Sequence, residues 1–170
     1  MSNTDMFSLD GKVAFIPGGS GAIGSALGAG LCEAGANVAI VDRDGDGLAR
    51  TCSLMRSEGK EPLAIAADLT NREDAERAVA ETVDKFGRLD IIVNAVGGGA
   101  GKVLFEAHEY PEKEWDWIMG INLTATVLPT QAAVKAMIAG GEGGRVINIS
   151  SVRAELGINA GYSAYVAAKG

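Results

Sequence analysis

The 170-residue sequence lacks several features that would point to particular classes of protein. Its two cysteines, Cys32 and Cys52, are too few and too isolated for a disulfide framework or a metal cluster, which favours a reducing, cytoplasmic setting. No run of about 18 or more apolar residues exists, so no membrane-spanning helix is expected. Residues 1–10 are polar and acidic, unlike a signal peptide. The single histidine, His108, falls in an irregular segment, and no catalytic role is predicted for it.

Basic segments are also missing. The formal net charge is −7 and the lysines and arginines form no block, which argues against nucleic acid as the main partner. No repeat occurs at solenoid spacing. The hydrophobic content of 47% suits a single domain spanning residues 1–170, or part of one. Glycine, in contrast, is plentiful at 24 residues, which gather at loop positions.

Short apolar runs alternate with helical patterns along the chain. Such alternation predicts an α/β fold, a Rossmann-type doubly wound parallel sheet with helices on both faces. The first predicted helix starts at Ala22, with Ile23, Ala26, Leu27 and Leu31 on one buried face. The last begins near Tyr165. Strands are predicted at 12–16, 38–41, 62–66, 89–93 and 145–149, and the other helices at 47–57, 71–86 and 112–139, the last kinked or split at Pro129.

The first strand leads into a glycine-rich turn. Residues 19–24, Gly-Ser-Gly-Ala-Ile-Gly, match G-x-G-x-x-G between a strand and a helix. Glycines permit a tight turn close to a pyrophosphate, and the N–H groups of the helix N-terminus bind the anion. This position favours a dinucleotide site over a merely flexible turn. The candidate cofactor-binding residues in the turn are Gly18, Ser20, Gly21, Ile23 and Gly24.

Asp42 ends the second strand, near the distance at which an acidic residue hydrogen-bonds the adenosine ribose. A carboxylate there repels a 2′-phosphate, so NAD is expected rather than NADP, although Arg43 next to it can hold a phosphate. A helix N-cap or a solvated residue is the alternative for Asp42. Residues 42–47 also fit half of an EF-hand loop, but Ser53 stands where a bidentate Glu is needed, so no calcium site is expected.

Further candidates follow the next two strands. Asp68 and Leu69 come after the third strand, and Asn94, Ala95 and Gly97 come after the fourth. Ligands of parallel sheets bind beyond the carboxyl ends of the strands. These residues and the glycine turn are therefore expected on one rim, in contact with the cofactor.

Tyr165 and Lys169 are spaced four apart, on one face of a helix. A free Tyr has a pKa of about 10, and a neighbouring ammonium group lowers it by stabilising the phenolate. The pair can thus serve as a general acid that exchanges a proton with an alcohol or carbonyl. By spacing alone a solvated helix face is the commoner reading, and the upstream motifs are what favour catalysis.

Five motifs in order resemble the short-chain dehydrogenase/reductase family from about Leu9 onward. They are residues 17–24 for T-G-x-x-x-G-x-G, residues 94–97 for N-N-A-G, Asn122, Ser151, and Tyr165 with Lys169 for Y-x-x-x-K. The resemblance implies NAD(P)-dependent oxidoreduction, with Tyr165 as acid/base, Lys169 lowering its pKa and binding the nicotinamide ribose, Ser151 holding the substrate oxygen, and Asn122 anchoring a relay water. It also places Asp68 by the adenine and Asn94 at a largely structural position. Pro17, Ala22 and Ala95-Val96 depart from the family pattern.

The resemblance implies a secondary alcohol or ketone as the substrate, and residues 153–157 look somewhat like gluconate 5-dehydrogenase and polyol or sugar dehydrogenases. A 3-oxoacyl carrier-protein reductase and a catalytically silent nucleotide-binding scaffold are the alternatives. Family members continue beyond the Tyr165 helix with further strands and a substrate lid. This polypeptide alone is therefore expected to be inactive, and the full-length protein to be a homodimer or homotetramer.

Overall fold

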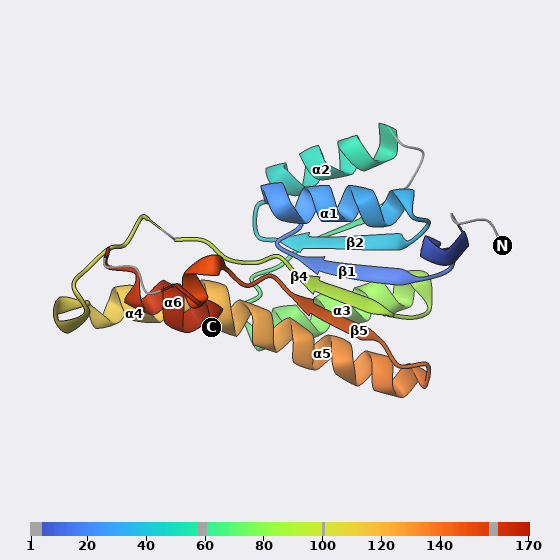
Figure 1. The fold of residues 1–170 in the computed structure, drawn as a ribbon. Coiled ribbons are helices and arrows are strands. Elements are labelled where there is room, and N and C mark those ends of the chain that lie inside the picture. The colour runs from blue at the N-terminus through green and yellow to red at the C-terminus, as the bar shows by residue number, and fades with distance from the viewer. Residues whose placement is uncertain (1–4, 58–60, 100, 157–159) are drawn as a thin grey trace.

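The computed structural model describes residues 5–57, 61–99, 101–156 and 160–170. Five parallel strands form one sheet in the order β3-β2-β1-β4-β5 (Figure 1). The chain starts in the middle of the sheet, moves outward to β3, and then crosses to β4 and β5. The strands are β1 (Val13–Pro17), β2 (Asn37–Asp42), β3 (Leu63–Ala66), β4 (Ile91–Asn94) and β5 (Arg145–Asn148).

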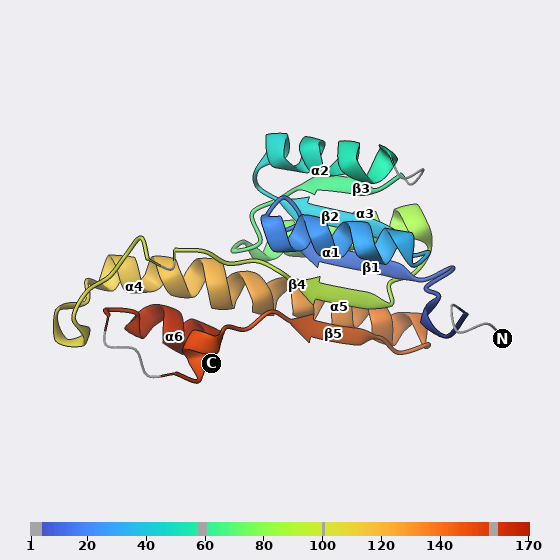
Figure 2. The same cartoon turned by 45° about the horizontal axis from the view of Figure 1, so that its top comes forward.

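Helices cover both faces of the sheet, as the alternating pattern predicts. Helices α1 (Ala22–Glu33) and α2 (Gly45–Ser57) lie on one face, and α3 (Arg72–Phe86) and α5 (Ala125–Gly140) lie on the other (Figures 1 and 2). Each face has its own apolar core, in which Ile16 and Ile40 face α1 and α2 while Phe15 and Val41 face the opposite layer. The doubly wound α/β fold is thus confirmed. In the described part of the chain, no helix combines the length and apolar character that crossing a membrane requires.

The buried face of α1 differs from the prediction. Gly24, Gly28 and Cys32 are buried, whereas Ile23 is 55% exposed. The reason is close packing of the helix on the sheet, since a Cβ added to Gly28 would already lie 3.5 Å from Ile16. Apolar periodicity predicted the bulky residues inside, but the glycines occupy the contact face instead.

The predicted helix over 112–139 is also wrong in detail. It divides into α4 (Glu112–Met119), a π-helical turn η3 (Gly120–Thr124) and α5. The break lies around Asn122 and not at Pro129, which is inside α5. Within this break, the Asn122 side chain donates to the Ile118 carbonyl over 2.9 Å. A π-turn of this kind often marks a functional position.

Helix α6 (Ser163–Lys169) packs against α4 beyond the carboxyl ends of the strands, where Figures 1 and 2 show the two helices together. Ile118 of α4 and Ala164 and Ala168 of α6 form a small third apolar cluster. Tyr165 packs against the same cluster. Three short 3-10 helices complete the described structure: η1 (Asp5–Phe7), η2 (Ala107–Glu109) and η4 (Val152–Ala154).

Candidate functional site

The sequence-predicted site residues gather at the carboxyl end of the sheet, because all five strands point the same way. The glycine turn follows β1, Asp42 ends β2, and Asn94 ends β4. Asp68 and Leu69 follow β3, and Ser151 follows β5. Parallel strands thus bring side chains separated by over a hundred positions in the sequence to one rim, as the doubly wound fold requires.

The glycine turn is held by close backbone contacts. Gly18 has a φ of +79°, and a Cβ there would lie 2.7 Å from the backbone of Ala95. A Cβ on Gly24 would clash with the Gly18 carbonyl oxygen. Gly21 is the N-cap of α1 and provides no side-chain cap, so the first N–H groups of this helix have no capping side chain. Such an uncapped helix N-terminus suits an anion.

Asp42 lies beside this turn and is bonded to it. Its Oδ2 accepts a hydrogen bond of 2.6 Å from the Ser20 hydroxyl, and its Oδ1 accepts one of 2.8 Å from the Arg43 N–H. Residue Asp44 bonds the Gly47 N–H at the start of α2. The segment that fits half of an EF-hand loop is therefore a strand end followed by a capped helix.

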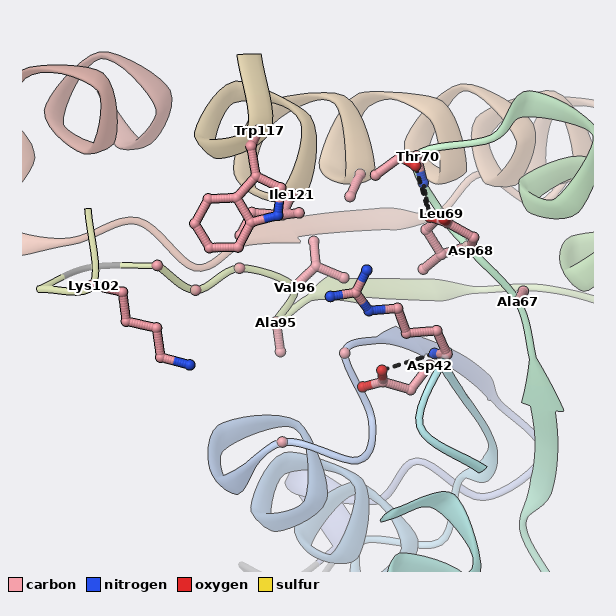
Figure 3. Close-up of a pocket in the computed structure, with 17 residues that line it drawn as sticks. Asp42, Ala67, Asp68, Leu69, Thr70, Ala95, Val96, Lys102, Trp117 and Ile121 are labelled. Atoms are coloured by element: carbon pink, nitrogen blue, oxygen red, sulfur yellow. Dashed lines mark hydrogen bonds between the residues drawn. The ribbon is translucent and has the colours of Figure 1, made fainter. Parts of the chain in front are cut away.

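A cavity of about 300 Å³ opens at this rim. Eight predicted residues line it: Gly18, Gly21, Asp42, Arg43, Asp68, Leu69, Ala95 and Gly97. Figure 3 shows Asp42 and Asp68 toward one end, with Lys102 and Trp117 toward the other. The sequence prediction missed Ala67, Thr70, Val96, Gly98, Gly99, Lys102, Trp117, Ile121 and Ala125. The glycine run after β4 was the available signal for part of this set.

Three predicted residues of the turn, Ser20, Ile23 and Gly24, are not among those that line the cavity. Ser20 orients Asp42, and Gly24 allows close packing beneath Gly18. Ile23 is exposed. Asn94 is 1% exposed and donates to the side chains of Thr130 and Asn148, each over 2.8 Å, so it ties β4 to its neighbours from below the rim.

Asn122 joins the π-turn to the loop after β4. Its Oδ1 accepts from the Gly98 N–H and its Nδ2 donates to the Gly98 carbonyl, both over 3.1 Å. It is 1% exposed, and its own carbonyl accepts from the Thr126 hydroxyl over 2.8 Å. Asn122 thus sets the path of the cavity wall, which its position in the sequence did not reveal.

Lys169 reaches the same wall from α6. Its ammonium group donates to the carbonyls of Val96 and Ile149, over 3.2 and 3.0 Å, at the ends of β4 and β5. Burial lowers the pKa of Lys169 from its ordinary value. Gly97 is where these groups meet, because a Cβ there would lie 2.6 Å from Asn122 Oδ1 and 3.0 Å from Lys169 Nζ.

Ser151 and Tyr165 both precede this lysine, Ser151 in the segment after β5 and Tyr165 in α6. Ser151 is the N-cap of η4, and its hydroxyl oxygen accepts a hydrogen bond of 3.2 Å from the Arg153 N–H. Tyr165 is partly buried, one turn before Lys169 in α6. A hydrogen bond of 2.6 Å from the Ser150 hydroxyl to the Lys169 carbonyl fastens the end of β5 to this helix.

The glycine turn, the start of α1 and the end of β2 together fit a dinucleotide. The turn leaves room that a Cβ would fill, the helix N-terminus is uncapped, and an acidic side chain stands at the end of β2. An anion at the helix N-terminus and a hydroxylated sugar at Asp42 match these groups chemically.

The comparisons with known proteins agree with this geometry. A family model described as short chain dehydrogenase matches residues 12–170. The chain belongs to the short-chain dehydrogenase family. The resemblance predicted from the five motifs is therefore confirmed.

Several relatives of this family member are named for polyol or sugar-acid substrates. A sorbitol dehydrogenase from Cereibacter sphaeroides is 36% identical over 146 residues, covering 84% of this chain and 54% of the relative. Gluconate 5-dehydrogenase from Gluconobacter oxydans is 34% identical over 170 residues, covering 100% and 64%. The structure of an NAD⁺-bound xylitol dehydrogenase matches with a TM-score of 0.86 at 27% identity, covering 94% and 60%. The chain thus spans about half to two thirds of the length of these relatives.

Proposed function

We propose that the full-length protein is an NAD(P)-dependent oxidoreductase that interconverts a secondary alcohol and a ketone, with a sugar acid, a polyol or a similar compound as substrate. The observation that carries this proposal is the docking of α6. Lys169 bonds the carbonyls at the ends of β4 and β5, so the Tyr165 helix lies at the same rim as the cavity. The names of the relatives support the substrate class.

In this proposal Tyr165 exchanges the proton with the substrate oxygen, and Ser151 orients that oxygen by a hydrogen bond. Lys169 stabilises the phenolate form of Tyr165 and binds the nicotinamide ribose. Asn122 holds the loop after β4 and anchors a relay water. When bound, the nicotinamide ring supplies or accepts the hydride.

NAD is the proposed cofactor in preference to NADP. Asp42 lines the cavity at the end of β2, where a carboxylate repels a 2′-phosphate. Arg43 also lines the cavity, so NADP is the cofactor that a competition experiment must exclude. Asp42 accepts from Ser20, and a ribose hydroxyl would have to share or replace that hydrogen bond.

A homodimer or homotetramer in the cytoplasm completes the proposal. Its support is a set of apolar side chains that are at least partly exposed on α4, η3 and α5 and could be covered by a second copy, namely Trp115, Leu123, Val127 and Ile138. Sedimentation of the full-length protein at several concentrations measures the assembly directly.

The test uses the full-length protein, NAD⁺ and NADP⁺, and a panel of sugar acids and polyols with oxoacyl thioesters as the competing class. Tyr165→Phe removes only the hydroxyl, so turnover should fall by about 10²–10⁴-fold or more. NADH affinity, measured by fluorescence titration, should change less than twofold. A Tyr165→Phe protein that keeps wild-type turnover would refute the catalytic assignment, and wild-type turnover of thioesters alone would favour a reductase of oxoacyl carriers.

A further inference from the structure

Arg153 occupies an unusual place beside the proposed reaction site. It belongs to η4, two residues after Ser151, and its guanidinium carbon lies 4.0 Å above the centre of the Tyr162 ring. Tyr162 is the residue before α6, one turn from Tyr165. The stack therefore joins the segment that follows β5 to the start of the helix that carries the proposed acid.

The stack leaves the hydrogen-bonding edge of Arg153 unused. A guanidinium group has five N–H donors that lie in its plane, and stacking occupies its face only. Within the described part of the chain, no hydrogen bond or ion pair engages these side-chain donors. The planar edge is the part that binds a carboxylate with two parallel hydrogen bonds. Tyr162 thus fixes the orientation of a group whose donors are left for another partner.

Tyr162 also lies against the loop that forms one end of the cavity. A Cβ on Gly101 would lie 3.6 Å from the Tyr162 hydroxyl, and the Phe105 N–H donates to the Gly161 carbonyl over 3.4 Å. The neighbouring residue Lys102 lines the cavity, at the end away from Asp42 in Figure 3. Arg153 is therefore on the side of the site that is remote from the adenosine end.

The charge around Arg153 points to an anionic partner. The chain has 22 acidic and 15 basic residues. Three basic residues nevertheless occupy this region: Lys102 lines the cavity, Lys169 donates to the Val96 carbonyl, and Arg153 stacks on Tyr162 outside the cavity lining. No ion pair of the described residues involves any of these three cations, although Glu155 follows Arg153 closely in the sequence. Lys169 already donates to two backbone carbonyls, so Lys102 and Arg153 are the two cations here that favour an anion from outside.

We propose that Arg153, oriented by its stack on Tyr162, binds the carboxylate of the substrate and so makes the enzyme selective for sugar acids over neutral polyols. This proposal rests on the proposed alcohol–ketone oxidoreduction, and it names the substrate class for that same site. Arg153 is a specificity-determining residue here and takes no part in the proton or hydride transfer. Lys102 adds positive potential to the same side.

The test compares substrates that differ only at one carbon. The pairs are gluconate with sorbitol, galactonate with galactitol, and threonate with threitol, each a carboxylate beside a primary alcohol. For at least one pair, the full-length wild-type protein should show a kcat/KM for the acid at least about tenfold above that for the polyol, the size expected of a charge-assisted hydrogen bond. Arg153→Gln should lower this ratio by about tenfold to a hundredfold, mainly through the KM of the acid. Arg153→Lys keeps the charge without the fork and should retain part of the preference.

Arg145→Gln is the matched control. Arg145 lies at the opposite end of β5, and its side chain donates to the neighbouring Gly144 carbonyl. The variant removes the same charge from the chain, so an unchanged acid-to-polyol ratio would show that the effect belongs to Arg153. Equal losses in both variants would indicate general electrostatics and overturn the proposal.

The outcomes separate this inference from the proposed function. Turnover of polyols without a preference for the acid in any pair would overturn the role of Arg153 and leave the oxidoreductase standing. If no alcohol or ketone is turned over, the proposed function fails. Calorimetric binding of the same pairs to the protein with NADH then tests whether Arg153 binds a carboxylate. Tighter binding of an acid that is lost in Arg153→Gln would then support the anion site, and equal binding of acid and polyol would overturn it.

Discussion

Buried charged groups are paired differently at the two ends of the sheet. At the amino end, where the strands begin, Asp90 is 8% exposed and is surrounded by donors. It accepts from the Val13 N–H over 2.9 Å and from Arg88 Nε over 2.8 Å, and Lys12 lies 3.5 Å away. Burial by itself would raise the pKa of Asp90, but these donors, Arg88 foremost, outweigh burial and lower it from 3.8.

The carboxyl end leaves its polar groups less completely paired. Lys169 meets two backbone carbonyls, and burial lowers its pKa, so its charged form is disfavoured. Among the described residues, Asn94 Oδ1 and Ser163 Oγ are buried without a hydrogen-bond partner, and α1 has no side-chain cap. Unsatisfied buried polar groups are costly in a folded protein.

The comparison indicates that the amino end of the sheet contributes mainly to stability and the carboxyl end mainly to binding. At the amino end, the buried carboxylate of Asp90 is paired within the chain with both Arg88 and Lys12. At the carboxyl end, the uncapped start of α1 lies at the cavity rim and offers N–H donors that a ligand can use. Changes at the first should therefore affect folding without altering binding, and changes at the second should do the reverse.

The largest expected effect is at the amino end. Asp90→Ala leaves the buried Val13 N–H without its acceptor and removes the carboxylate that Arg88 and Lys12 share, so the free energy of unfolding should fall by about 2–3 kcal/mol. NADH affinity, measured below the unfolding transition, should stay within twofold. Denaturant unfolding of the full-length protein gives the first number and fluorescence titration the second.

The matched control is Glu81→Ala, which removes an exposed i,i+4 partner of Arg77 and should cost about 0.5 kcal/mol or less. The pH dependence gives a second check. Because the pKa of Asp90 is lowered on folding, its contribution is fully present above the ordinary value near 3.8 and is lost as the pH falls through the lowered value. The difference between wild type and Asp90→Ala should shrink in that acid range, and a constant difference would contradict the proposed role of the charge.

A smaller effect, on NADH affinity, is expected from Gly24→Ala at the carboxyl end. The new Cβ clashes with the Gly18 carbonyl, so the turn must move and NADH should bind about 100-fold more weakly, as expected for a displaced binding group. Gly30→Ala lies in the same helix with nothing within 4 Å of its Cβ, so it should leave NADH binding unchanged and add up to about 1 kcal/mol of stability. Wild-type NADH affinity in Gly24→Ala would show that the turn is not the nucleotide site.

The parts of this site that local sequence encodes could be predicted, and the parts that depend on distant contacts could not. The glycine turn and Asp42 follow from strand, turn and helix signals within about thirty residues. The π-turn at Asn122 depends on Gly98, which is 24 positions away, and no periodicity in 112–139 reveals it. The stack of Arg153 on Tyr162 and the position of Trp117 in the cavity likewise need the folded chain.

Packing explains the remaining error. The periodicity of α1 placed Ile23 inside, whereas the helix approaches the sheet through Gly24 and Gly28. A glycine face allows a shorter distance between helix and sheet than an apolar side chain does, and a hydrophobicity pattern does not record this. Gly24 belongs both to the turn that suits a nucleotide and to this buried face, so its role in packing was not apparent from the hydrophobicity pattern.

The smallest expected effect concerns the charge of Lys169. Burial lowers its pKa on folding, so the unfolded chain binds more protons between the lowered value and 10.5. Stability contributed by this residue should therefore rise as the pH increases through that window and be lost as the pH falls. Lys169→Met has no such titration. The free energy of unfolding of the wild type should therefore increase relative to that of the variant as the pH approaches 10.5. If the free energy of unfolding of the wild type instead decreases relative to that of the variant, the carbonyls of Val96 and Ile149 stabilise the ammonium more than burial disfavours it. The contrast between the two ends of the sheet would then not hold at Lys169.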